Sequence, residues 1–338
     1  MPVSDTLRVI DFGRVDAVRS QTLWHAIAHG VSAGEPPTLA FVRPAEPYVC
    51  IGYHRRVEEV DLDLCRARGL PVLRRMVGGG PVYLDEGQLF FQIVLPVSAV
   101  SPNRARALRD LLSPAVEAFR SVGIPAELDD DLELVVGDQK VCGHGAGQIE
   151  DAVVVVGNLI ETFDHETAAS VLRVPRPEAR VELERLMRRY VVATPGDADA
   201  FRDAATAAYA TALSLEPVNG VLSAFEVERL AELDRQFVDP EWVNGAGRPS
   251  PDVWQAKVRA GVWVLAAEHE GTSVVAGVSR GRIERAVVTD ADLNGATPSV
   301  EHALVGRELD DVAAALGEFG APGERIAAVL ARADGSRL

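Results

Sequence analysis

Residues 74–87 read RRMVGGGPVYLDEG, a pattern that predicts a strand, a glycine turn and a second strand. The consecutive residues Gly78, Gly79 and Gly80 leave a stretch of backbone without Cβ atoms, so its N–H groups can touch a ligand directly. Arg74 and Arg75 precede the glycines and offer guanidinium donors suited to phosphate or carboxylate. No Gly-Lys-Ser/Thr follows, which excludes a Walker loop. From these residues alone, a ligand-binding loop and a plain glycine hairpin both stay open.

A second glycine-rich stretch, GDQKVCGHGAGQ at residues 137–148, contains a lysine. The chain has 34 basic residues, of which only Lys140 and Lys257 are lysines. Lysine offers a compact, mobile ammonium where arginine offers a fixed planar fork, so a lysine retained in an arginine-rich chain suggests a specific task. In a glycine-rich loop, the Lys140 ammonium could bridge an acyl carbonyl and a phosphate. We therefore predict that Lys140 is functional and that Lys257 is incidental.

Acidic and nucleophilic residues lie on either side of this lysine. Asp129, Asp130 and Asp131 form a cluster that suits Mg²⁺ on a nucleotide, or a solvated turn. Cys142 follows Lys140 by two residues, and a nearby ammonium favours the thiolate form of a cysteine. A buried, inert cysteine is the alternative interpretation. No cysteine spacing here fits a structural metal site.

The composition limits the class of protein. The 338 residues carry a net charge of −16, with 47% hydrophobic and 25% charged residues, as in globular domains. The acidic balance argues against general nucleic-acid binding. No apolar stretch is long enough to cross a membrane, and no signal peptide is evident at the start. Three cysteines cannot form a disulfide framework, so we expect a cytoplasmic protein, and we expect a monomer.

The pattern of predicted elements indicates an α+β fold in two parts. Strands are expected at 38–44, 48–54, 132–137 and 152–160, with helices at 15–30, 61–69, 103–123, 178–191, 199–213 and 223–237. Within residues 103–123, Pro114 is expected to open a helix as its first residue. A loop rich in Pro, Gly and Asn at 238–252 predicts a domain boundary. The predicted domains are 1–240, a mixed sheet flanked by helices, and 250–338, a small α+β domain with helices at 307–319 and 322–333.

The segments RRMVGGGPVYLDEG, GDQKVCG and VGNLIE, in this order, resemble the lipoate–protein ligase family, part of the biotin/lipoate ligase superfamily. The resemblance covers about residues 15–165 and implies a catalytic domain related to class II tRNA synthetases, followed by an accessory domain. It also implies that lipoate or a similar acid is activated with MgATP to an acyl adenylate. The acyl group then passes to a lysine of a lipoyl domain, such as glycine cleavage H protein or a 2-oxoacid dehydrogenase E2-like acceptor.

The resemblance also implies a role for individual residues. Lys140 would hold the acyl carboxylate and α-phosphate, and the nucleotide and Mg²⁺ would be placed by Asp131 and Asp85. Other residues would line the substrate site, namely Arg74, Arg75, Gly78, Gly79, Gly80, Val82, Tyr83 and Gly143.

The sequence departs from the family pattern at several positions, and two alternatives stay open. Leu84 and Val156 stand where histidines are usual, Gln88 where Asn is usual, and Cys142 where Ser or Ala is usual. The first alternative is an ATP-independent octanoyl or lipoyl transferase that works through a cysteine thioester, for which Cys142 is the low-ranking candidate nucleophile. The second is a non-catalytic protein that binds lipoyl domains or small acids.

Overall fold

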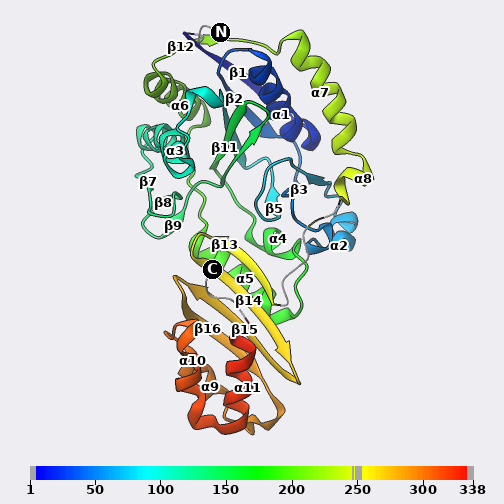
Figure 1. Cartoon of the computed structure of the whole chain (residues 1–338), viewed down its shortest axis with the longest axis vertical. Coiled ribbons are helices and arrows are strands. Elements are labelled where there is room, and N and C mark those ends of the chain that lie inside the picture. The colour runs from blue at the N-terminus through cyan, green and yellow to red at the C-terminus, as the bar shows by residue number, and fades with distance from the viewer. Residues whose placement is uncertain (1–4, 246, 248–252, 333–338) are drawn as a thin grey trace. The chain divides into compact units, whose positions relative to one another are not determined.

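The computed structural model describes residues 5–245, 247 and 253–332, which form two compact units (Figure 1). The first unit takes its described residues from Met1–Asp164 and Val192–Arg248, and the second from His165–Val191 and Pro249–Leu338. The domains 1–240 and 250–338 stay a prediction. Residues 165–191, which that prediction assigns to the first domain, group with the second unit, and residue 250 lies outside the described residues.

The first unit contains both helices and strands. Its helices are α1 (Ala17–Ala33), α2 (Leu62–Ala67), α3 (Arg104–Ser121), α6 (Ala198–Leu213), α7 (Ala224–Phe237) and α8 (Pro240–Val243). Its strands are β1 (Thr6–Val15), β2 (Thr38–Pro44), β3 (Tyr48–Ile51), β4 (Val72–Arg74), β5 (Val82–Leu84), β6 (Gln88–Pro96), β7 (Glu127–Leu128), β8 (Leu134–Val136), β9 (Gln139–Lys140), β10 (His144–Ile149), β11 (Ala152–Ile160) and β12 (Glu216–Asn219).

The described residues of the first unit build a six-stranded mixed sheet in the order β10-β11-β6-β2-β1-β12. β1 runs parallel to β2 and β12, while β2, β6, β11 and β10 pair antiparallel in turn. Helices α3 and α6 pack together against a core that includes Phe91, Phe119 and Phe201, and α1 packs with α7 (Figure 1). Two shorter sheets, β4-β3-β5 and β7-β8-β9, complete the unit and present the two glycine-rich stretches. The predicted α+β class with a mixed sheet flanked by helices is confirmed.

The expectation for Pro114 is wrong. α3 runs without interruption from Arg104, and Pro114 lies inside it and is buried. Its neighbour Ser113 donates its hydroxyl hydrogen to the carbonyl oxygen of Arg109 at 2.8 Å. The helix keeps its apolar face on the core on both sides of the proline, including Leu112 and Phe119, and this packing outweighs the local cost of the missing N–H.

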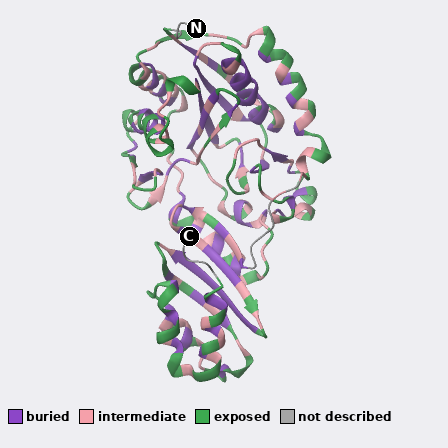
Figure 2. Cartoon of the chain, viewed as in Figure 1, coloured by how far each residue is buried: buried purple, intermediate pink, exposed green. Residues whose placement is uncertain are grey.

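Four strands and several helices form the second unit. Its helices are α4 (His165–Ser170), α5 (Pro177–Tyr190), α9 (Thr297–Leu304), α10 (Val312–Leu316) and α11 (Gly320–Leu330). Its strands are β13 (Trp254–Arg259), β14 (Val262–His269), β15 (Thr272–Ser279) and β16 (Arg282–Thr289), which pair antiparallel in sequence order. Alternate side chains of the strands face two cores, so that Val264 packs with α5 while Leu265 packs with α9 and α11. Figure 2 shows exposed residues along the helices, whereas β15, an inner strand of the sheet, is buried along most of its length.

No helix among the described residues is long and apolar enough to cross a membrane.

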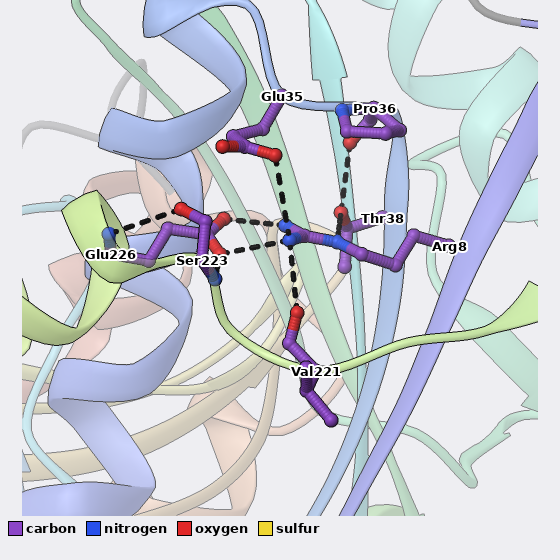
Figure 3. A network of polar contacts seen from close by, with 7 residues as sticks. All are labelled: Arg8, Glu35, Pro36, Thr38, Val221, Ser223 and Glu226. Carbon is purple, nitrogen blue, oxygen red and sulfur yellow. Dashed lines mark hydrogen bonds and ion pairs between the residues drawn. The ribbon is translucent and has the colours of Figure 1, made fainter.

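A buried ion pair fixes α7 to the sheet of the first unit (Figure 3). The Arg8 guanidinium on β1 donates to both carboxylate oxygens of Glu226, with Nη1 at 2.8 Å from Oε2. Glu226 has no exposed surface and Arg8 is 6% exposed. Arg8 Nε donates to the Thr38 hydroxyl at 2.9 Å, and Glu226 also accepts the N–H of Ser223 at 2.8 Å, which closes the predicted capping box of α7. Several donors thus satisfy the buried carboxylate.

Glu226→Ala should lower the free energy of unfolding by about 3–5 kcal/mol, because the variant leaves the Arg8 guanidinium charged, buried and without its main acceptor. Urea unfolding followed by tryptophan fluorescence measures the change. Glu228→Ala on the exposed side of the same helix is the control and should stay within about 0.5 kcal/mol of the parent. Equal stabilities of the two variants would contradict the role given to the ion pair.

Candidate functional site

The glycine loop connects β4 to β5 and is shaped by Arg75. The Arg75 side chain donates from Nε and Nη2 to the Gly78 carbonyl oxygen at 3.1 and 2.8 Å, and from Nη2 to the Gly80 carbonyl oxygen at 3.0 Å. Its Nη1 donates to the carbonyl oxygen of Cys50 on β3 at 3.1 Å. The loop curls around one half-buried guanidinium, while Gly78, Gly79 and Gly80 are exposed. The glycine backbone is therefore open to a ligand.

Two further contacts anchor this loop to the rest of the unit. The N–H of Met76 donates to His25 Nε2 on α1 at 3.2 Å. His25 Nδ1 lies 2.7 Å from the Gln21 carbonyl oxygen and must carry the proton, which leaves Nε2 as an acceptor. Burial lowers the pKa of His25 to about 3, so the ring is neutral. A Cβ on Gly52 would overlap the carbonyl oxygen of Gly79, so only glycine permits this close approach.

Arg74 makes structural contacts to the main chain, and the ligand-binding role implied by the family resemblance stays a prediction. It is 2% exposed, and every guanidinium nitrogen donates to main-chain carbonyl oxygens. The acceptors lie on two segments: Gly52, Tyr53 and Arg55 on one, and Trp242, Val243 and Gly245 on the other. Burial lowers the pKa of Arg74 from its ordinary value. The side chain therefore ties α8 to the loop after β3.

Lys140 lies on the second strand of a hairpin whose turn is formed by Gly137 and Asp138. The Lys140 carbonyl oxygen accepts the N–H of Val192 at 3.0 Å, which fixes the backbone at this position. Its Nζ donates to Glu133 Oε1 at 3.0 Å. The two side chains are 16% and 6% exposed, so the ammonium is held in a largely buried ion pair.

The acidic cluster forms a turn. The Asp129 carboxylate accepts the N–H groups of Asp131 and Glu133 at 3.0 and 2.9 Å, and Leu132 adopts a left-handed φ of 61° within the turn. Asp131 itself is exposed. The turn interpretation therefore holds for Asp129, while the Asp131 side chain stays at the surface.

A chain of buried amides connects the two motifs. The N–H of Gly143, three residues after Lys140, donates to Asn158 Oδ1 on β11 at 2.6 Å. Asn158 Nδ2 donates to Gln88 Oε1 on β6 at 2.8 Å, and Gln88 Nε2 donates to Asp85 Oδ1 at 3.3 Å. Asn158 is 4% exposed. This polar chain (Asp85, Gln88, Asn158, Gly143) thus runs from the end of the glycine motif to the lysine loop.

Asp85 belongs to this chain, and its assignment as a nucleotide or Mg²⁺ ligand stays a prediction. Its carboxylate is buried and also accepts the N–H of Gly87 at 3.0 Å. Burial raises its pKa, while the bonds from Gly87 and Gln88 oppose the shift. Burial likewise raises the pKa of the neighbouring half-buried Tyr83, which hydrogen-bonds Asp85. Val82 on the same strand is exposed.

The glycine motif also contacts the lysine loop through β10. A Cβ on Gly147 would overlap the side chain of Val77, so these residues touch only because position 147 is glycine. The two stretches therefore meet beside the edge strand β10 of the six-stranded sheet, through residues that are 70 positions apart in sequence.

Comparison with known proteins identifies the family to which this chain belongs. Residues 16–191, about half of the chain, match the model of the lipoyl protein ligase A/B catalytic domain. The chain belongs to this family. The family match includes both glycine-rich stretches and Lys140, so the fold and the motif order implied by the resemblance are confirmed.

Individual relatives include both ligases and transferases. Octanoyltransferase LipM of Moorella thermoacetica is 23% identical over 277 residues, covering 71% of this chain and 98% of its own. Lipoate-protein ligase A subunit 1 of Thermoplasma acidophilum is 26% identical over 236 residues, covering 65% and 89%. A solved bi-partite lipoate protein ligase from Thermoplasma acidophilum, studied with its E2 lipoyl domain, is similar at a TM-score of 0.66 and 25% identity, covering 72% and 98%. Sequence similarity alone therefore leaves the acyl donor open in this family member.

All three cysteines of the family member are buried and free. Cys142 has no exposed surface, and its sulfur accepts the N–H of Asn158 at 3.4 Å. Burial raises the pKa of Cys142 to about 12, and the Lys140 charge opposes this only in part. Cys142 is therefore a protonated core residue, which argues against its candidacy as a nucleophile.

Three residues of the site, namely Glu133, Asn158 and Gln88, are not among the site residues expected from the sequence. Glu133 lies in the stretch LELVVG, where one carboxylate in an apolar strand is the only signal. Gln88 stands where Asn is usual in the family, and the structure pairs it with Asn158. That departure is the sequence signal that could have suggested the contact. Among the described residues, no group of three or more His, Cys, Asp or Glu could hold a metal ion.

Asn158→Ala should lower the free energy of unfolding by about 2–4 kcal/mol, because the Gly143 N–H and the Gln88 carbonyl oxygen both lose a buried partner. Chemical denaturation measures the loss, and hydrogen exchange should show faster exchange at Gly143. Asn219→Ala, at an exposed position on β12, is the control and should change little. Unchanged exchange at Gly143 would refute the polar chain.

The cysteine environment predicts thiol reactivity and a pH dependence. Ellman's reagent should modify none of the three thiols in the native protein at pH 8 and all three in denaturant.

Because the Cys142 thiol ionises near 9.0 when unfolded and near 12 when folded, the folded state retains the proton longer. Stability should therefore fall as the pH rises above about 9. A Cys142→Ala variant should lose part of this dependence; rapid labelling of native Cys142 would overturn its assignment.

Proposed function

We propose that this chain is an ATP-dependent lipoate–protein ligase. It would activate lipoate or octanoate as an acyl adenylate and transfer the acyl group to a lysine of a lipoyl domain. The burial of every cysteine is the observation that carries the choice, because transfer through an enzyme thioester needs an accessible thiolate. Adenylate chemistry needs no covalent bond to the enzyme, only positioned charges and dipoles.

Lys140 is the catalytic residue of this proposal. Its ammonium would bond the carboxylate oxygen of the acid and then the α-phosphate of the adenylate. As the acceptor amine attacks the acyl carbon and loses a proton, AMP departs with the electron pair of the broken C–O bond. A cation beside the carbonyl stabilises the charge that develops on oxygen. Lys140 precedes Gly143, whose N–H is fixed by the polar chain, so its loop is held in place before substrate arrives.

The glycine loop is the proposed binding segment for the adenylate. Gly78, Gly79 and Gly80 are exposed and lack Cβ atoms, so their backbone can lie against a phosphate or acyl chain. Arg75 holds the loop and is only half-buried, which leaves part of its guanidinium near that surface. Val82 and Tyr83 would line the acyl side.

The acidic turn suits Mg²⁺ that arrives bound to a nucleotide better than it suits a metal ion held by protein side chains alone. Mg²⁺ in nucleotide sites takes one or two carboxylates together with phosphates and water. Asp131 is exposed, and the Asp129 turn fixes its backbone. A surface carboxylate suits a cation that arrives on the nucleotide, and Asp131 is the residue that would hold it.

The acceptor would be a lipoyl domain, as in glycine cleavage H protein or a 2-oxoacid dehydrogenase E2-like subunit. The similar archaeal ligase was studied with its E2 lipoyl domain, which supports this choice of partner. The alternative donor, an octanoylated carrier protein, is favoured by the LipM relatives. The buried state of Cys142 weighs against the thioester form of that reaction.

Lys140→Ala should lower kcat/KM for acid-dependent ATP–pyrophosphate exchange by about 10²–10³-fold, the usual effect of removing one charge-stabilising donor. The assay uses the purified full chain with lipoate and with octanoate. Lys257→Ala is the matched control, since Lys257 lies on β13 in the second unit, 5.9 Å from the Trp263 ring centre.

Three outcomes discriminate the candidates. Exchange that depends on Lys140 but not Lys257 supports the ligase. Acyl transfer from an octanoylated carrier without ATP, together with no exchange, would replace the ligase with the transferase. Binding of acid or lipoyl domain without either reaction would leave a non-catalytic binding protein.

A further inference from the structure

Glu133 forms an ion pair with Lys140, and neither charge is freely hydrated. Nζ and Oε1 are 3.0 Å apart, with 16% and 6% of the side chains exposed. Two charges at this distance interact strongly when little water lies between them. Any anion that approaches Lys140 therefore meets an ammonium whose charge is already largely compensated.

The position of Glu133 is built by the acidic turn. Asp129 accepts the Glu133 N–H at 2.9 Å, and the Asp129 N–H donates to the Glu133 carbonyl oxygen at 3.0 Å. The N–H of Val141 donates to the carbonyl oxygen of Leu134, which aligns the strand after Glu133 with the strand that carries Lys140. Backbone bonds on both sides thus fix the register that brings the two charged side chains together.

We propose that Glu133 is a positioning residue that holds the Lys140 ammonium in the free enzyme and competes with the substrate anion for it. This inference rests on the proposed function, because it assigns Lys140 the anion. On binding, the carboxylate or phosphate oxygen shares or replaces Oε1 as the acceptor of the Nζ protons. Glu133 thereby orients the ammonium and lowers its affinity for anions, which also eases release of AMP.

A role that depends on the negative charge of Glu133 and a role that depends only on the shape of its side chain predict different anion affinities in variants. Glu133→Gln keeps the length of the side chain and an oxygen acceptor but removes the negative charge. Anions should then bind about tenfold tighter, the size expected from one lost repulsion at a partly screened distance. A neutral ligand such as octanamide should bind equally to both proteins. Glu133→Asp keeps the charge and should keep anion affinity near that of the parent.

The lysine count makes a direct measurement possible. Because Lys140 and Lys257 are the only lysines, the full chain labelled with ¹³Cε,¹⁵Nζ-lysine gives two side-chain NMR signals. Lys257→Arg assigns them. The Lys140 signal is followed in the parent, Glu133→Gln and Glu133→Asp during titration with octanoate, octanamide and inorganic phosphate. Glu127→Gln, an exposed carboxylate on the adjoining strand β7, is the matched control.

The expected result is a Lys140 signal that moves in Glu133→Gln and stays in place in Glu127→Gln. Octanoate and phosphate should then shift it at about tenfold lower concentration in Glu133→Gln than in the parent. A Lys140 signal insensitive to Glu133→Gln overturns the inference, as do equal anion affinities. Phosphate binding that tightens without any octanoate response supports the role of Glu133 and counts against octanoate in the proposed function. If no anion reaches Lys140 in either protein, both proposals fail.

Discussion

The site depends on one constraint: four buried or partly buried polar groups on β6, β11 and two neighbouring loops must satisfy one another. The Gly143 N–H, the Asn158 and Gln88 amides and the Asp85 carboxylate do so in a single chain. Each link fixes the next, because an unpaired buried amide is costly. The glycine loop and the lysine loop are therefore positioned relative to each other by the sheet itself, with no need for a ligand to organise them.

The charged groups around this chain divide into those that build the site and those left for chemistry. Arg74 and Arg75 are adjacent in sequence, yet one is buried among carbonyl oxygens and the other braces an exposed loop. Asp129 makes a turn while Asp131 faces solvent. The two side chains of each pair are chemically identical, but the backbone directs them differently. One side chain of each pair therefore has a structural role.

Sequence reasoning succeeded where local pattern dominates. The capping box at Ser223 and the apolar run at 152–160 give α7 and β11 nearly to the residue, because caps and strand patterns act over a few positions. It failed where a contact spans the chain. The carbonyl acceptors of Arg74 lie up to 171 residues away, and Glu133 reaches Lys140 only through hairpin register. Pro114 was misjudged because distant core packing, not the local N–H, decides the course of α3.

The contacts of Arg74 bear on the shortest segment of this protein that keeps the first unit complete. The family match ends at residue 191, but the carbonyl oxygens of Val243 and Gly245 complete the Arg74 guanidinium, and β12 and α7 complete the sheet and its cover. The family match therefore stops short of residues that complete the first unit. A chain shortened to the matched segment would leave the Arg74 guanidinium without its acceptors in the 242–245 segment, whereas a chain that continues through residue 245 would keep them.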